Sequence, residues 1–226
     1  MKVYFVTGTD TGIGKTTVAC ALLAKAAQDG LTTLGLKPVV AGCEETPDGL
    51  RNEDALKLQV VSTLKLGYSE INPVALAAPL SPHLAAQAAG KRLSVRQLSG
   101  YVRASLSHRP QLALVEGAGG WRVPISEREL FSAFPKDMGI PVILVVGLRL
   151  GCLNHALLTT EAILKDGLRL AGWVGNRIDP DMTAVDENIA TLRQWLPAPC
   201  LGILDYHPDA DPFVLAALLD LTAILS

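Results

Sequence analysis

The most constraining stretch of this chain is its start, where an apolar run leads through glycines into a Lys-Thr pair and an Ala/Leu-rich segment. Residues 3–7 are apolar, aromatic or β-branched, residues 8–17 contain three glycines, and residues 18–23 are almost wholly apolar. This order predicts a buried strand, a tight loop and a helix. Free N–H groups and a partial positive charge at the helix N-terminus suit a bound phosphate.

The residues that open this helix indicate what the loop binds. Lys15 places an ammonium on the outer phosphates of a nucleotide, and the Thr16 hydroxyl suits Mg²⁺. The strict phosphate-loop pattern has glycine at position 9, where this chain has Thr9, but Gly12 and Gly14 still allow close backbone approach. The alternative is an ordinary strand-to-helix turn, which has no need of a Lys-Thr pair.

Length and charge restrict the class of protein. The 226 residues suit one α/β domain, spanning 1–226. A net charge of −2 without any basic cluster argues against nucleic acid or an anionic membrane surface as a partner. The four cysteines include no C-x-x-C pair and there is no long apolar run, so we expect reduced cysteines, no zinc, no membrane segment and a cytoplasmic location.

Strand and helix patterns alternate along the whole chain. The pattern predicts a three-layer α/β/α fold with a mainly parallel, doubly wound sheet covered on both faces. Residues 39–51, rich in Gly, Pro and acidic residues, are expected to form a long loop, and residues 213–225 a packed C-terminal helix. The other expected strands are at 33–38, 112–116, 141–146, 169–176 and 200–204. The other expected helices are a short one after the loop at 77–83, one that starts at Ser94, and those at 52–61, 153–166 and 183–196.

Three charged residues lie where strands end or a helix starts, at the sheet edge where ligands gather in such folds. Lys37 ends one strand, and is either solvated or part of the phosphate site. Asp54 lies in the first turn of a helix, where it either complements the helix dipole or contributes to a Mg²⁺ site. Glu116 ends an apolar strand before three closely spaced glycines, which resembles a Walker B strand and suits Mg²⁺.

Two further junctions predict ligand contacts. Residues 147–155 form a strand-to-helix junction whose N–H groups suit an anion such as a substrate carboxylate. Asn176 closes an apolar strand and either reads an adenine edge through its amide or is a turn residue. His83, a single loop histidine, is expected to be a capping or surface residue and not a catalyst.

With these pieces placed, the chain resembles the dethiobiotin synthetases, a family of the P-loop NTPase superfamily. The resemblance rests on residues 8–16, 37–39, 54, 81–83, 115–121 and 150–155, and it accounts for Thr9, which that family shares. It implies a ligase of biotin biosynthesis that closes the ureido ring of dethiobiotin from 7,8-diaminononanoate, CO₂ and ATP with Mg²⁺. It also implies a homodimer.

The resemblance implies a role for each matching residue. Lys37 and Lys15 would be catalytic, and Thr16, Asp54 and Glu116 would hold Mg²⁺. The nucleotide would be bound by Gly12, Ile13, Gly14, Lys15, Thr16, Thr17, Asp54, Glu116, Gly117, Ala118, Gly119 and Asn176. The diamine would be bound by Thr11, Lys37, Ala41, Pro79, Gly151, Cys152, Leu153 and Asn154, the last four from the neighbouring subunit.

Three positions depart from the family pattern. Ala41 stands where a serine is frequent, so a hydroxyl that helps bind the diamine or carbamate is missing. Gly12 replaces a glutamate of some relatives. In residues 204–208 a proline expected soon after the last strand is missing, since the first proline there is Pro208, and this departure concerns the base-binding loop.

Two rival classes of function remain. A partner-driven ATPase switch of the partitioning and septum-positioning type shares this branch of folds, but needs a second loop lysine where this chain has Asp10. A glutamine-dependent amide-forming enzyme needs an additional glutaminase domain, for which 226 residues leave no room.

Overall fold

The computed structural model describes residues 1–207 and 210–226. Its centre is a six-stranded sheet in the order β10-β9-β8-β1-β7-β2, and every adjacent pair is parallel. The expected parallel sheet is therefore confirmed. The strands of this sheet are β1 (Lys2–Gly8), β2 (Thr33–Leu36), β7 (Leu112–Gly120), β8 (Val142–Leu148), β9 (Leu170–Arg177) and β10 (Cys200–Leu204).

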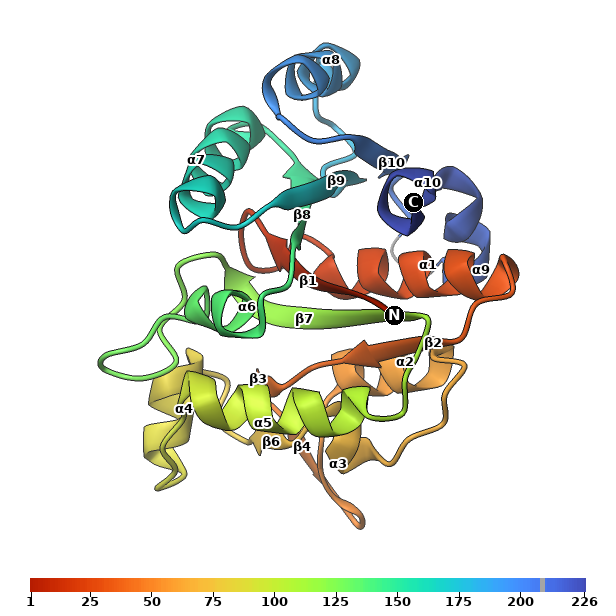
Figure 1. Ribbon diagram of the computed structural model, residues 1–226. Coiled ribbons are helices and arrows are strands. Elements are labelled where there is room, and N and C mark those ends of the chain that lie inside the picture. Colours follow the sequence, from red (N-terminus) through yellow and green to blue (C-terminus); the bar gives the residue numbers. More distant parts are fainter. Residues whose placement is uncertain (208–209) are drawn as a thin grey trace.

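Helices cover both faces of the sheet, which gives three layers (Figure 1). Helix α1 packs against β1, β2 and β7 on one face, and α7 packs against β8 and β9 on the other. The helices are α1 (Lys15–Gln28), α2 (Glu53–Val61), α3 (Tyr68–Ile71), α4 (Pro82–Ala88), α5 (Val95–Leu106), α6 (Ala133–Met138), α7 (Cys152–Lys165), α8 (Val185–Trp195), α9 (Pro212–Leu215), the 3₁₀ turn η1 (Ala216–Leu218) and α10 (Thr222–Leu225).

Strand β1 is central because its residues are apolar on both faces. Phe5 lies under the aromatic rings of Phe131 and Phe134, at centroid distances of 5.5 and 5.7 Å. A Cβ on Gly117 would meet the Phe5 ring, so glycine lets β7 pass close to β1. The strand order reverses around β1 and β7, and the ligand edge of such a sheet lies at that point.

The segment expected to be a long loop is structured. Residues 39–51 contain β3 (Val39–Ala41), which pairs in parallel with β6 (Val74–Leu76), and the antiparallel hairpin of β4 (Glu44–Thr46) and β5 (Gly49–Arg51). The loop prediction was wrong for β3 because its partner lies more than thirty residues further along the chain, and for β4 and β5 because this short hairpin lacks alternating apolar residues. Strand β7 also continues beyond Glu116 through the glycines to Gly120.

The C-terminal segment is a broken helix and not the single one expected. Leu219 forms an antiparallel bridge with Gly202, and Asp220 N donates to Leu201 O at 2.8 Å. A Cβ on Gly202 would collide with the backbone at Leu218, so glycine permits this contact. Pairing with β10 thus interrupts the helix between η1 and α10.

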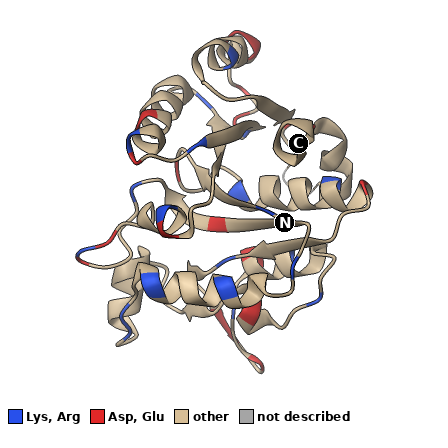
Figure 2. Ribbon diagram, in the orientation of Figure 1, with Lys and Arg blue, Asp and Glu red and all other residues tan. Residues whose placement is uncertain are grey.

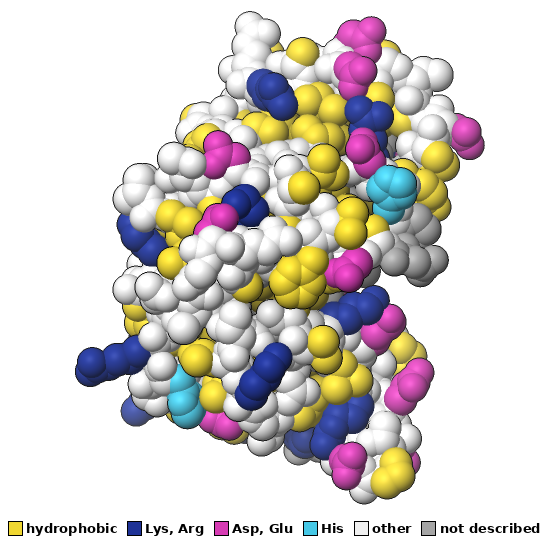
Figure 3. Space-filling model, turned by 90° about the vertical axis from the view of Figure 1, so that its right-hand side faces the viewer, with side chains coloured by type: hydrophobic (Ala, Val, Ile, Leu, Met, Phe, Trp, Pro, Cys, Tyr) yellow, Lys and Arg dark blue, Asp and Glu magenta, His cyan; other side chains and the backbone are white. Residues whose placement is uncertain are grey.

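Charged residues are spread over helices and loops and are sparse on the central strands (Figure 2). The face in Figure 3 mixes acidic, basic and apolar side chains, without a large area of one sign. The expectation that nucleic acid is not a partner agrees with this surface but stays a prediction. Among the described residues, no helix is both long enough and apolar enough to cross a membrane.

Candidate active site

The loop between β1 and α1 is shaped by glycines in left-handed backbone conformations. Gly12 has φ of 72° and Gly14 has φ of 81°, values that side-chain-bearing residues rarely adopt. A Cβ on Gly14 would also collide with Asn176 Nδ2, which donates to Ile13 O at 2.9 Å. Gly14 caps α1 without a side-chain hydrogen bond, so the first N–H groups of the helix remain available for an anion.

Lys15 projects from the first position of α1 into this loop. Its Nζ donates to Asp10 O at 2.9 Å, and the side chain is buried. Burial lowers the pKa of Lys15 to about 8, and the positive charge of Lys37 contributes to the decrease. A bound anion at the loop would raise the pKa of Lys15 again, because its negative charge offsets both the burial and the repulsion from Lys37.

Three elements bring a lysine and two carboxylates together at the ligand edge. Lys37 follows β2, and its Nζ lies 2.5 Å from Glu116 Oε1 on β7 and 3.1 Å from Asp54 Oδ2 on α2. Burial alone would lower the pKa of Lys37, but the charges of Glu116 and Asp54 outweigh it and raise that pKa above its usual value. The same cluster lowers the pKa of Asp54, although burial acts in the opposite direction.

The oxygen donors of this cluster suit a magnesium ion. Thr16 Oγ1 donates to Glu116 Oε1 at 2.9 Å, which brings the hydroxyl to the carboxylates. Glu116 is 1% exposed, and its Oε2 is buried without a hydrogen-bond partner. A buried carboxylate oxygen without a partner is costly unless a cation compensates it, and Mg²⁺ prefers oxygen ligands. The residues present therefore fit the metal.

One cavity of about 530 Å³ joins the loop to this cluster. It contains most of the residues that the sequence analysis singled out, from the loop, from the two strand ends and from α2. These residues are Thr11, Gly12, Gly14, Lys15, Thr16, Thr17, Lys37, Ala41, Asp54, Glu116, Ala118 and Gly119.

Other predicted residues lie outside the lining of this cavity. Ile13 is buried behind the loop, Gly117 packs on Phe5, and Pro79 adjoins Gly42. Asn176 is tied to the loop through Ile13, so its amide nitrogen already has an acceptor. The predicted carboxylate residues Gly151, Cys152, Leu153 and Asn154 form the start of α7 and do not line the cavity.

The sequence analysis missed part of the cavity lining. Lys57 is one helical turn after Asp54, and that spacing was a usable signal. Ser81 was part of a recognised motif but was not assigned to the site. The additional lining residues are Val40, Lys57, Leu80, Ser81, Pro82 and Val123. Pro208, in the expected base-binding loop, lies outside the described residues.

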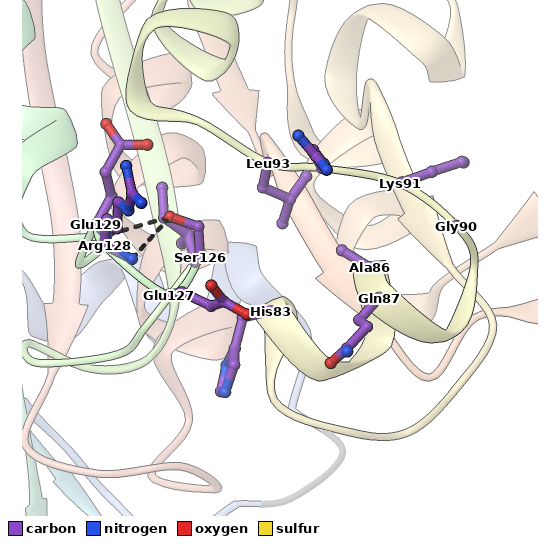
Figure 4. A pocket seen from close by; sticks show the side chains of 12 residues that line it. His83, Ala86, Gln87, Gly90, Lys91, Leu93, Ser126, Glu127, Arg128 and Glu129 are labelled. Carbon is purple, nitrogen blue, oxygen red and sulfur yellow. Dashed lines mark hydrogen bonds between the residues drawn. The ribbon is translucent and has the colours of Figure 1, made fainter.

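His83 faces a different cavity. This second cavity, of about 840 Å³, lies between α4, the turn after it and residues 125–129 (Figure 4). Ser126 Oγ accepts hydrogen bonds from the backbone N–H groups of Arg128 and Glu129 at its rim. None of its lining residues lines the first cavity, and that His83 is not a catalyst stays a prediction.

The parallel sheet, the glycine loop at the start of α1 and the acidic residue on β7 define a P-loop nucleotide-binding protein. A family model described as "AAA domain" matches residues 2–213. The chain is 54% identical to the ATP-dependent dethiobiotin synthetase BioD of Cellvibrio japonicus, over 99% of this chain and 98% of that protein. It belongs to the ATP-dependent dethiobiotin synthetase family.

Further relatives agree with this membership. The protein of the same name from Marinobacter nauticus is 48% identical, with 98% of this chain and 97% of that protein covered. Among solved structures, the MinC:MinD cell division protein complex of Aquifex aeolicus matches with a TM-score of 0.59 and 16% identity, covering 96% of this chain and 86% of that one. Chloroplast FtsY of Physcomitrella patens matches with a TM-score of 0.52 and 16% identity, covering 99% and 63%. At these identities the two structures show the fold alone.

Proposed function

We propose that this chain is an ATP- and Mg²⁺-dependent ligase of biotin biosynthesis, which converts 7,8-diaminononanoate and CO₂ to dethiobiotin with release of ADP and phosphate. The observation that carries the proposal is the convergence of Lys15, Lys37, Asp54 and Glu116 on one cavity. Membership of the family indicates the reaction, and the charged residues that line the cavity suit that reaction.

The proposed reaction has three balanced steps. One amine of the diamine adds to CO₂ and loses a proton, which gives a carbamate. A carbamate oxygen then takes the γ-phosphoryl group of ATP, and ADP leaves. The second amine attacks the carbonyl carbon of the resulting mixed anhydride, loses a proton and expels phosphate. Negative charge accumulates on the transferred group in each phosphate step, so fixed cations lower the barrier.

Each group of residues at the site has a separate proposed role in this reaction. Lys15 and the N–H groups of the loop, including those of Ile13, Gly14 and Thr17, would bind the outer phosphates. Lys37, once released from the carboxylates, would neutralise the carbamate and the transferred phosphoryl group. Thr16, Asp54 and Glu116 would hold Mg²⁺, which supplies charge neutralisation of the phosphates. Gly117, Ala118 and Gly119 would let the backbone of β7 pass close to the nucleotide.

Asn176 would contribute to nucleotide choice. Its Nδ2 donates to Ile13 O, so its Oδ1 is left as an acceptor for a base. An acceptor at this place suits the exocyclic amino group of adenine. The carboxamide would thus hold the loop and read the base at the same time.

The diamine would lie between two copies of the chain. Thr11, Ala41 and Pro79 would line its reactive end in one subunit, and Gly151 to Asn154 of the other would receive its carboxylate at the start of α7. Leu150, directly before this segment, is 93% exposed, which supports burial in a homodimer. We place the reaction in the cytoplasm, where the free cysteines of the described chain would stay reduced.

A phosphate-release assay tests the proposed function. With MgATP and bicarbonate present, release should depend on 7,8-diaminononanoate, and mass spectrometry should detect dethiobiotin. Phosphate release of the same size without the diamine would overturn the ligase and favour a partner-driven ATPase switch. Sedimentation with and without the diamine tests the dimer independently.

A further inference from the structure

Arg149 lies against the phosphate loop although it is far from it in the sequence. Its Nη2 donates to Asp10 Oδ2 at 2.7 Å, across 139 residues. Asp10 Oδ1 accepts a second hydrogen bond from Thr11 N at 2.8 Å, so both oxygens of this carboxylate have partners. None of the roles proposed above uses this ion pair.

Asp10 connects Arg149 to the lysine of the loop. The Asp10 carbonyl accepts the hydrogen bond of Lys15 Nζ at 2.9 Å, so the orientation of this peptide affects the lysine directly. The neighbouring residue, Thr9, is held by β8, because Thr9 N donates to Val145 O at 3.0 Å. The first half of the loop is therefore fixed by β8 and by the segment that follows it.

The same arginine closes the turn that starts α7. Its backbone oxygen accepts a hydrogen bond from Cys152 N at 3.0 Å, and Cys152 is the first residue of α7. The side chain of Arg149 thus holds the phosphate loop while its backbone holds the segment proposed to receive the substrate carboxylate. Arg149 therefore contacts both the phosphate loop and the start of α7.

The charge of Asp10 makes this partner necessary. A carboxylate in a loop shaped for phosphates repels the anion that the loop binds, because like charges close together weaken binding. Lys15 contacts the Asp10 backbone carbonyl and Lys37 contacts Glu116 and Asp54, so neither lysine forms an ion pair with the Asp10 side chain, although the charges of Lys15 and Asp10 attract each other. Arg149 is the cation in contact with it in the part of the chain that the structure describes.

We propose that Arg149 is a positioning residue for the nucleotide: it neutralises and orients Asp10, and thereby keeps the phosphate loop and the start of α7 in one arrangement. This inference rests on the proposed function only in that the loop binds the triphosphate. It requires no contact between Arg149 and the substrates.

Calorimetric titration with Mg²⁺ and the non-hydrolysable ATP analogue adenylyl imidodiphosphate tests the proposal. Arg149→Met should raise the Kd of the analogue by about three- to tenfold, since the exposed ion pair is lost and the repulsion between the Asp10 carboxylate and the phosphates is no longer compensated. Arg149→Lys should restore most of the affinity. The double variant Asp10→Asn/Arg149→Met should bind better than Arg149→Met alone, because the unpaired carboxylate is gone.

Two further readouts separate positioning from a purely structural role. The difference between wild type and Arg149→Met should shrink at high salt, because both side chains are about half exposed, at 44% and 46%. In turnover, the KM for ATP should rise while kcat stays within about twofold, because the Lys37 cluster is untouched. Arg103→Met is the matched control: it breaks an exposed Arg–Asp pair between α5 and α6 and should leave the Kd unchanged.

The proposal is overturned if Arg149→Met binds the analogue as tightly as wild type does. It is equally overturned if the double variant is as weak as Arg149→Met and Arg149→Lys restores nothing. Wild-type protein that binds the analogue but forms no dethiobiotin would count against the proposed function and leave this inference standing.

Discussion

The ammonium of Lys37 lies 2.5 Å from Glu116 Oε1, and both side chains are buried, at 4% and 1% exposure. Seventy-nine residues separate them in the sequence. Lys37 is proposed to stabilise the transferred phosphoryl group, but here its ammonium is paired with the two carboxylates that are proposed to hold Mg²⁺. Catalysis then requires that the lysine leaves these carboxylates when the metal and the nucleotide bind.

Loss of the Lys37 ammonium should reduce turnover more than binding. For Lys37→Ala, we expect kcat to fall by about 10²–10³-fold, the usual cost of removing one charge-stabilising donor. The Kd for MgATP should change much less, because Lys15 and the loop bind the phosphates. Single-turnover kinetics and calorimetry measure the two quantities separately. Turnover near the wild-type value would remove Lys37 from the catalytic role.

Removal of the same ammonium should tighten metal binding in the absence of nucleotide. Lys37→Met leaves Asp54 and Glu116 without their cation, so Mn²⁺ used as a probe no longer competes with an ammonium. We expect the Mn²⁺ Kd, measured by electron paramagnetic resonance at pH 8, to fall by about tenfold, or about 1.4 kcal/mol.

Two variants control this experiment. Lys15→Met should tighten Mn²⁺ binding much less than Lys37→Met does, because Lys15 contacts a backbone carbonyl and acts on the carboxylates only from a distance. Glu116→Gln should weaken it, because a neutral amide replaces a carboxylate. Equal or weaker Mn²⁺ binding by Lys37→Met would show that the lysine does not occupy the metal position.

The hydrogen bond from Asn176 to Ile13 predicts which nucleotides the enzyme accepts. Because Oδ1 is left as an acceptor, GTP would present its O6 acceptor to it, at a cost of about 1–3 kcal/mol, or roughly 5- to 150-fold in kcat/KM relative to ATP. Asn176→Ala should weaken the binding of both nucleotides, because the loop loses the hydrogen bond at Ile13. It should also bring the ratio of kcat/KM for ATP to kcat/KM for GTP towards one. A ratio unchanged by this substitution would assign base selection to another residue.

Ala41 lines the cavity without offering a polar group. Ala41→Ser adds a hydroxyl where the family pattern has one, and a net hydrogen bond is worth about 0.5–1.5 kcal/mol. We expect the KM for 7,8-diaminononanoate to fall by a corresponding factor, while the KM for ATP serves as the internal control. An equal change in both KM values would indicate a general change of the cavity instead of a diamine contact.

Cys20 should be resistant to alkylation in the folded protein. Burial raises the pKa of Cys20 to about 12, and the residue is 2% exposed. The thiolate is the reactive form, so its fraction stays very small at pH 8 and grows only as the pH approaches this pKa. Peptide mapping after iodoacetamide treatment should find the partly exposed Cys200 labelled first. Equal labelling of Cys20 would contradict its burial.

The sequence by itself determined the features that depend on neighbouring residues. The strand, glycine loop and helix of residues 2–28 are specified locally, because strand pattern, turn residues and the helix start follow each other directly. The alternation of apolar strands and helices predicted a parallel sheet, and the parallel sheet predicted the edge where Lys37, Asp54 and Glu116 meet. The motifs of the family were equally readable from the sequence.

Only the tertiary structure decided which distant residues touch. It placed Lys37 between Glu116 and Asp54, tied Asn176 to Ile13 and brought Arg149 to Asp10. It also made strands of residues 39–51 and broke the C-terminal helix at Leu219. Apart from the local hairpin of β4 and β5, these outcomes depend on contacts between segments far apart in the chain, which local propensity and periodicity do not encode. Their physical cause is the cooperative packing of the six-stranded sheet and the two small sheets, which fixes the strand pairs and the charged clusters together.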